Sequence, residues 1–254
     1  LATHGRASSN ALFNCNQRIT KRSFHSIFIH EVRENLIGNY NYVSTFAELS
    51  QLLFPSRCFG CQRLGPSICS ACRSSWHPHY YKSTFDNFSV HSALIYTPTA
   101  SKIILAAKES GHKGADELII EAIIHVLEKR RGDTSLCRLV PVPSGRAAQR
   151  RRGRSFLVDL VSQISDRTAI PMLDCLQLSR KVMDQSRLHR DQRATNLAGA
   201  FSLRCAARGE LILIDDVVTT GATLREAVRA VNSQGIHAVG PVSAVTACVA
   251  QPLR

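Results

Sequence analysis

Four cysteines that lie within fifteen residues of one another have the spacing of a metal site. Cys58 and Cys61 form one Cys-x-x-Cys pair, and Cys69 and Cys72 form a second pair after seven intervening residues. Zinc prefers soft ligands at tetrahedral positions, and each tight Cys-x-x-Cys turn supplies two thiolates. We therefore predict a structural Zn²⁺ site, because four protein ligands leave no coordination position open for catalysis. Iron in the same four-thiolate site, a redox dithiol and two unrelated buried cysteine pairs are the alternatives.

A second group of residues suited to ligand chemistry lies near the C-terminus. Leu211–Ile214 is continuously apolar and predicts a buried strand, which is followed at once by two carboxylates, Asp215 and Asp216. Open α/β sheets bind ligands at the carboxyl ends of their strands. Carboxylates at that position suit the hydroxyl groups of a ribose, and a magnesium ion through water.

The loop after the two carboxylates is rich in hydroxyl groups and leads into a predicted helix. Its sequence is Thr219-Thr220-Gly221-Ala222-Thr223, and backbone N–H groups and threonine side chains in such a loop can surround a phosphate. A helix cap made by Thr219 or Thr220 is the simpler interpretation. Capping accounts for one hydroxyl group but not for paired acids after an apolar strand. No Gly-Lys-Ser/Thr follows, so the loop is not a Walker P-loop.

Arginines are concentrated in two stretches of the chain. Residues 138–154 contain six arginines and no acid, and a second basic stretch runs from Arg180 to Arg193. A solvated basic surface is the simpler interpretation for any single arginine. Taken together, the two stretches suit a diphosphate or a nucleic-acid backbone, and the sequence alone does not separate these ligands.

The composition limits the class of protein that positions these residues. The chain has 254 residues, of which 44% are hydrophobic and 20% charged, as in a globular domain with a smaller second module. No apolar run approaches the ~18 residues that span a bilayer, so we expect no membrane span. The net charge of +13 indicates partners that carry phosphate or other anionic groups. Nine cysteines without a secretory signal favour a cytoplasmic location with reduced thiols.

Predicted strands and helices alternate over residues 86–250. We expect strands at Ser89–Tyr96, Leu139–Val142, Leu211–Ile214 and His237–Ala247. We expect helices at Thr99–Glu109, Ala115–Lys129, Ser155–Ile164 and Ala222–Val231. The alternation, with late strands that are apolar on both faces, predicts an α/β domain with a mostly parallel sheet flanked by helices.

The first part of the chain has a different character. Residues 1–43 show no clean apolar period, and we interpret them as an extension upstream of the true start, with Val43 as an alternative initiation codon. An organellar transit peptide is the alternative, because no acid precedes Glu31. Apolar residues then recur at helical spacing, which predicts a helix plus a four-cysteine zinc module over residues 44–82.

The Asp215–Thr223 segment resembles the phosphoribosyl-diphosphate (PRPP) signature of type I phosphoribosyltransferases. Together with the two cysteine pairs, it makes the chain resemble one branch, the competence protein F or ComF/GntX-like family, over about four-fifths of its length. Leu139–Pro143 and the Arg193–Phe201 segment belong to the same resemblance. The family usually continues its Arg-Gly pair with Phe-Asn-Gln, whereas Arg154-Ser155-Phe156 stands here.

The resemblance implies a type I phosphoribosyltransferase-like fold with an N-terminal double zinc ribbon. It implies Mg²⁺-bound PRPP as ligand, and transfer of phosphoribose to a nitrogen acceptor with release of pyrophosphate. Asp215 and Asp216 would be catalytic, and Ser144–Arg146 would form the pyrophosphate loop. The PRPP-binding residues implied in this way are Asp215, Asp216, Val217, Thr219, Thr220, Gly221, Ala222, Thr223, Arg146 and Lys181.

The resemblance also leaves a second class of function open. A non-catalytic module could keep the PRPP pocket and act in DNA uptake or utilisation, with single-stranded DNA or DNA-uptake proteins as partners. The sequence contains no recognisable base-binding pocket, so it does not identify the acceptor.

Overall fold

A computed structural model describes residues 56–85, 87–130, 136–180, 196–206, 209–233 and 239–250. All of these residues belong to one compact unit that begins at Pro55. The predicted extension 1–43 and the helix expected after it lie outside the described residues, so both stay predictions.

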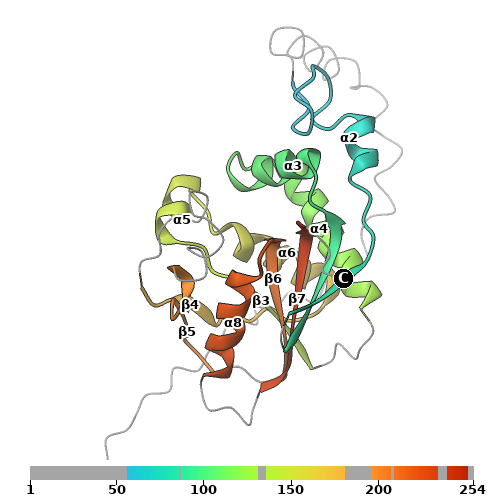
Figure 1. Ribbon diagram of the computed structural model, residues 1–254. Helices are drawn as coiled ribbons and strands as arrows, with labels where there is room; N and C mark the ends of the chain where they lie inside the picture. The colour runs from blue at the N-terminus through green and yellow to red at the C-terminus, as the bar shows by residue number, and fades with distance from the viewer. Residues whose placement is uncertain are drawn as a thin grey trace, which may run out of the picture. The chain divides into compact units, whose positions relative to one another are not determined.

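A five-stranded sheet in the order β1-β2-β7-β6-β3 forms the centre of this unit (Figure 1). Its strands are β1 (Tyr81–Phe85), β2 (Phe88–Ile95), β3 (Cys137–Pro141), β6 (Gly209–Val218) and β7 (Val239–Val249). Only β1 and β2 pair antiparallel, and the other neighbours in this sheet are parallel. The prediction of an α/β class with a mostly parallel sheet is confirmed.

Helices cover both faces of the sheet, because some connections between strands run one way along the strand order and others run the opposite way. The described helices are α2 (Ser70–Ser75), α3 (Pro98–Lys108), α4 (Lys113–Lys129), α5 (Arg146–Arg152), α6 (Phe156–Thr168) and α8 (Ala222–Asn232). The connection from β2 to β3 runs one way across the sheet, and the connection from β6 through α8 to β7 runs the other way. Right-handed crossovers then place α3 and α4 on the face opposite α8, and Figure 1 shows α8 in front of the strands with α4 and α6 behind.

The eight predicted elements are present, with ends that differ by a few residues. The largest difference is in β6, which continues to Val218 and so contains Asp215 and Asp216 instead of ending before them. An end at Ile214 was expected because the continuous apolar run stops there. Pairing with β7, which continues as far as Val218, extends the strand beyond that point.

Several short elements were not predicted. The antiparallel pair β4 (Leu176–Leu178) and β5 (Phe201–Leu203) forms a separate two-stranded sheet. Strand β1 and the helices α2 and α5 were missed as well. Strands of three residues and helices of six or seven residues contain too few positions to show an apolar period.

The cysteine-rich segment shares the hydrophobic core of the α/β domain. Phe59 and Trp76 are buried in the same cluster of apolar side chains as the sheet residues. The indole Nε1 of Trp76 donates a hydrogen bond of 3.1 Å to the carbonyl oxygen of Leu118 in α4, and Phe59 stacks on His112. Among the described helices, none combines the length and apolar character that a bilayer crossing requires.

Candidate functional site

The four predicted cysteine ligands come together in one cluster. The Sγ atoms of Cys58, Cys61, Cys69 and Cys72 all lie within 4.8 Å of one another, and the Sγ atoms of Cys61 and Cys69 are 3.7 Å apart. Cys58 and Cys72 are buried, whereas the other two cysteines are half-buried. The predicted grouping of the four thiols is confirmed, and their number, softness and spacing suit a zinc ion.

Two tight backbone reversals build this cluster. In the first pair, the N–H of Gln62 donates to the carbonyl oxygen of Cys58 at 2.7 Å, and Gln62 adopts a positive φ of 66°. In the second pair, Cys69 is the N-cap of α2, which places Cys72 in the first turn of that helix. The N–H of Cys69 also donates to the Sγ of Cys58 at 3.3 Å and so connects the two turns.

The surroundings of Cys58 favour its thiolate form. Burial by itself raises the pKa of Cys58, but the backbone N–H groups of Cys69, Cys61 and Gly60 donate to its sulfur and lower the pKa to about 6. A thiolate is the form of cysteine that binds a metal. Gly60 leaves room for the cluster, since a Cβ there would lie 2.8 Å from the Sγ of Cys72.

The two carboxylates lie where β6 loses one of its neighbours. β3 pairs with β6 only as far as Ile214, whereas β7 continues alongside β6 past Asp215. The N–H of Val142, the first residue after β3, donates to the carbonyl oxygen of Ile214 at 3.0 Å. The segment expected to form the pyrophosphate loop therefore leaves β3 directly beside Asp215 and then enters α5. Chain divergence of this kind produces the crevice in which open α/β sheets bind ligands.

The carboxylate pair has a charged partner, Lys108, that was not predicted from the sequence. Lys108, in the last turn of α3, places its Nζ 2.6 Å from the Oδ2 of Asp216. A signal was present in the sequence, because Lys108 follows Ile104 by four residues and so falls on the apolar face of a predicted helix. A cation on the buried stripe of a helix indicates a buried acid elsewhere in the chain.

The two carboxyl groups differ in the direction in which their pKa is shifted, although both are at least nine-tenths buried. Burial raises the pKa of Asp215 well above its usual range, and the neighbouring charge of Asp216 adds to this effect. Burial also acts to raise the pKa of Asp216, but the ammonium group of Lys108 outweighs it and the pKa is lowered. The site therefore pairs a carboxylate, Asp216, that Lys108 stabilises with a second carboxyl group, Asp215, whose pKa is raised and which holds its proton more tightly than an ordinary aspartate.

We expect Lys108→Met to lower the free energy of unfolding by about 1–3 kcal/mol, because it leaves the carboxylate of Asp216 buried without its charged partner. The double variant Lys108→Met with Asp216→Asn should lose less than the two single changes added together, by about 1–2 kcal/mol. Urea denaturation of the four proteins measures this coupling. Lys102→Met, at an exposed position of the same helix, is the control and should change stability little. Strictly additive effects would contradict the pairing.

The loop after β6 ends in a glycine that the packing requires. Gly221 is the N-cap of α8 with a φ of 73°, and a Cβ at this position would lie 2.6 Å from the Cε1 of Phe85. Arg225 lies over the Phe85 ring and donates to the carbonyl oxygen of Thr220 at 2.6 Å. The N-cap position is therefore a glycine, but the expected role of Thr220 is kept in part, because its hydroxyl accepts a hydrogen bond of 3.4 Å from the N–H of Ala222, the first residue of α8. The following N–H groups of this helix start can bind an anion.

Gly221→Ala should lower the free energy of unfolding by about 2 kcal/mol or more. The change combines the cost of a left-handed backbone at an alanine, about 1–2 kcal/mol, with the close approach to Phe85. Gly145→Ala is a matched control, because Gly145 has a φ of −60° and no atom within 4 Å of the added Cβ. Thermal or urea unfolding measures both changes, and equal small losses in the two variants would contradict this account.

The arginines of residues 138–154 divide into anchored and exposed side chains. Arg152 donates to Glu109 Oε1 at 3.0 and 2.7 Å, and Arg154 donates to the two oxygens of Asp116 at 2.7 Å each. Arg146 begins α5 beside the loop that follows β3 and is exposed. The other residue predicted to bind the diphosphate, Lys181, lies outside the described residues.

Comparisons with known proteins add little to this description. No family model matches the chain, and no curated protein matches it. The solved structures that resemble it include adenine phosphoribosyl transferase from Trypanosoma brucei in complex with AMP, pyrophosphate and ribose-5-phosphate. That match has a TM-score of 0.37 and 13% sequence identity, and it covers 75% of this chain and 84% of the other. A similarity of this size does not bear on the function of the present chain.

Proposed function

We propose that the chain is a phosphoribosyltransferase-type protein that binds Mg²⁺-PRPP at the carboxyl end of β6. The observation that carries the proposal is the buried pair Asp215–Asp216, which lies where β3 has ended and is followed by a threonine- and glycine-containing loop into α8. The ion pair with Lys108 compensates the burial of Asp216, but no ion pair within the described residues compensates that of Asp215. A packing role alone would favour an apolar residue at position 215, because a buried carboxyl group costs free energy.

In this proposal each end of the ligand has its own partners. Asp215 and Asp216 accept hydrogen bonds from the ribose hydroxyl groups, and the Thr219–Thr223 loop binds the 5-phosphate with its N–H and hydroxyl groups. Arg146 and Lys181 contact the diphosphate. Lys108 acts as a positioning residue, since its ion pair holds Asp216 in the ionised form that accepts hydrogen bonds. Magnesium, when bound with PRPP, would neutralise part of the diphosphate charge.

The reaction we propose is the displacement of pyrophosphate from the ribose C1 by a nitrogen nucleophile. The C1–N bond forms while the C1–O bond breaks, the pyrophosphate leaves with the bonding electron pair, and the nitrogen loses a proton. The protein contributes mainly by positioning the two reactants and by stabilising the departing charge. We further propose that the chain belongs to the ComF/GntX-like branch and holds structural zinc at Cys58, Cys61, Cys69 and Cys72. A cytoplasmic location, where thiols stay reduced, suits such a site.

The enzyme hypothesis is tested by PRPP-dependent release of pyrophosphate over a panel of nucleobases and other nitrogen acceptors. We expect release with at least one acceptor, and its loss in Asp216→Asn. PRPP binding without turnover across the panel would favour the non-catalytic alternative.

The exposed arginines of α5 support that alternative, a module that binds single-stranded DNA in DNA uptake or utilisation. Arg146, Arg150 and Arg151 lie on this helix with exposed side chains. A protein that neutralises several phosphates loses affinity steeply as salt is raised. Single-stranded DNA binding with a steep salt dependence, reduced by Arg150→Gln with Arg151→Gln, would support the alternative.

A further inference from the structure

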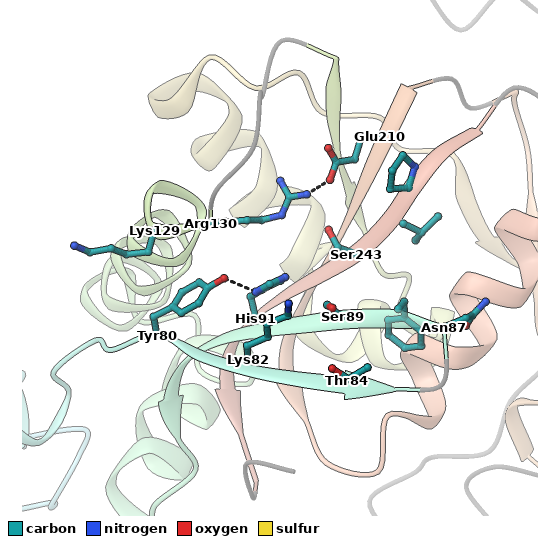
Figure 2. A pocket seen from close by; sticks show the side chains of 13 residues that line it. Tyr80, Lys82, Thr84, Asn87, Ser89, His91, Lys129, Arg130, Glu210 and Ser243 are labelled. Carbon is teal, nitrogen blue, oxygen red and sulfur yellow. Dashed lines mark hydrogen bonds and ion pairs between the residues drawn. The ribbon is translucent and has the colours of Figure 1, made fainter. Parts of the chain in front are cut away.

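A pocket lies at the opposite edge of the sheet from Asp215, where the parallel strands begin (Figure 2). It has a volume of about 680 Å³ and is lined by Glu210 at the start of β6 and by Ser243 on β7. Asp215 lies five residues after Glu210 along β6, a distance of about 16 Å at the rise of an extended strand. The pocket is therefore separate from the carboxylate site, and its volume lies in the range of small-molecule sites.

Three hydroxyl groups form a row across the sheet inside this pocket. Thr84 on β1 is the pairing partner of Ser89 on β2, and Ser89 is the pairing partner of Ser243 on β7. Residues that pair across neighbouring strands point to the same face, so the three side chains lie side by side. The next residue of the row is Ile212 on β6, where the sheet face becomes apolar again.

Ser243 is the member of this row whose hydroxyl group stabilises no other part of the described structure through a hydrogen bond. Its side chain lines the pocket and is only 7% exposed. Within the described residues, no group forms a hydrogen bond with its Oγ atom. Buried hydroxyl groups are nearly always paired, because an unpaired one loses its bonds to water without replacement. An unpaired hydroxyl at the wall of a pocket is therefore directed at a ligand.

The charges around the row favour an anion. Arg130 at the end of α4 forms an ion pair with Glu210, so these two side chains neutralise each other. Burial lowers the pKa of His91 to about 4, and the charges of Arg130 and Lys82 act in the same direction, so this imidazole is neutral at pH 7. Lys82 and Lys129 then leave the lining with a positive excess. Figure 2 shows Lys82 on the same part of the sheet as the hydroxyl row, and Lys129 further out.

The histidine also holds one wall of the pocket in place. The hydroxyl group of Tyr80 and the Nδ1 of His91 share a hydrogen bond of 2.7 Å, which Figure 2 shows as a dashed line. The ring of Tyr80 and Pro241, which lies two residues before Ser243 and so on the same face of β7, contribute apolar surface to the lining. The pocket thus combines cations and hydroxyl donors with an apolar portion.

We propose that this pocket binds a small phosphate ester, with its phosphate beside Lys82 and the hydroxyl of Ser243 and its organic part against Tyr80 and Pro241. Three phosphate oxygens can accept from an ammonium group and from neighbouring hydroxyl groups at once, a set of donors that this face supplies. The site is new with respect to the proposed PRPP pocket and does not depend on it, because it uses the other ends of the strands.

The test uses AMP as the probe, with adenosine and inorganic phosphate as comparison ligands, and follows the amide resonances of the ¹⁵N-labelled full chain. We expect AMP at up to millimolar concentration to shift the resonances of Ser89 and Ser243, and adenosine to shift them far less. Inorganic phosphate should shift the amide resonance of Ser243 more than that of Val242. Shifts confined to the Thr220–Thr223 region would overturn this proposal while supporting the PRPP site. Shifts at Ser89 and Ser243 without shifts at Thr220–Thr223 would support this proposal, and the PRPP site is tested separately with PRPP.

Two variants separate ligand binding from structural support. Ser243→Ala should weaken AMP binding at the pocket about threefold or more, while the Tm of the free protein stays equal or rises, because the unpaired hydroxyl is removed. Lys82→Gln should weaken it by about three- to tenfold. Lys102→Gln, an exposed lysine on α3, is the matched control. AMP affinity that is unchanged in Ser243→Ala and Lys82→Gln would overturn the proposal.

Discussion

Asp216→Asn should weaken the binding of Mg²⁺-PRPP by roughly ten- to a hundredfold. The substitution keeps the shape of the side chain but removes a charge-assisted hydrogen bond, worth about 1.5–3 kcal/mol, and ~1.4 kcal/mol corresponds to a factor of ten. It also removes the partner of Lys108, which lies 2.6 Å away. Calorimetry with PRPP, with and without magnesium, measures the change. Magnesium should strengthen binding to the unmodified protein, and it should help the variant less.

Asp215→Asn should act differently, through the pH dependence of binding. Because the pKa of Asp215 is raised, its proton leaves at a higher pH than the proton of an ordinary aspartate, and it must leave before the carboxylate can accept hydrogen bonds from ribose hydroxyl groups. PRPP affinity of the unmodified protein should therefore increase as pH rises through the pKa of Asp215, because the carboxylate forms over this range. Below that pKa the affinity should decrease. Asp215→Asn should flatten this dependence and should not reduce stability at neutral pH, since it removes a carboxyl group that burial disfavours in its charged form.

Asp166→Asn, at an exposed position of α6, is the control for both aspartate variants and should leave PRPP binding unchanged. Two outcomes would contradict the proposed site. One is an unmodified protein that does not bind PRPP at millimolar concentration. The other is an Asp216→Asn variant with the affinity of the unmodified protein.

Replacing Cys58 and Cys61 together by serine should abolish metal binding, which we expect at about one zinc per chain in the unmodified protein. Two serine hydroxyl groups in place of thiolates leave only half of the ligand set. Binding of structural zinc contributes about 10–16 kcal/mol to folding in small zinc modules, so the cysteine-rich segment should lose its ordered structure. Metal analysis of the purified variants measures the first effect, and it also separates zinc from iron.

The single tryptophan of the chain reports the structural consequence. Trp76 is 4% exposed and donates to the carbonyl oxygen of Leu118, so its emission should shift to longer wavelength when the segment separates from α4. Cys205→Ser, a half-buried cysteine outside the cluster, is the control and should keep both the metal and the emission maximum. A double variant that keeps stoichiometric metal would rule out the four-thiolate site. Unchanged Trp76 emission after metal loss would show that packing alone holds the segment.

The features that were correctly predicted are local in the chain. The two Cys-x-x-Cys pairs form a cluster because each pair closes its own turn, and the connection between them is only seven residues long. The strand that carries Asp215 and Asp216 was recognised from a run of apolar residues, and the alternation of strands with helices indicated a parallel sheet. Such patterns depend on neighbours within a few residues, so the sequence displays them directly.

The sequence by itself thus determined the fold class, the four metal-binding candidates and the place of the carboxylate pair along the chain. Only the tertiary structure decided that Lys108 meets Asp216, which lies 108 residues later, and that β3 ends beside the carboxylates. The same holds for the row that joins Thr84, Ser89 and Ser243. The physical reason is that strand order, register and helix docking are set by burial of the whole core. Contacts between distant segments therefore leave no periodic signal in the sequence of either one.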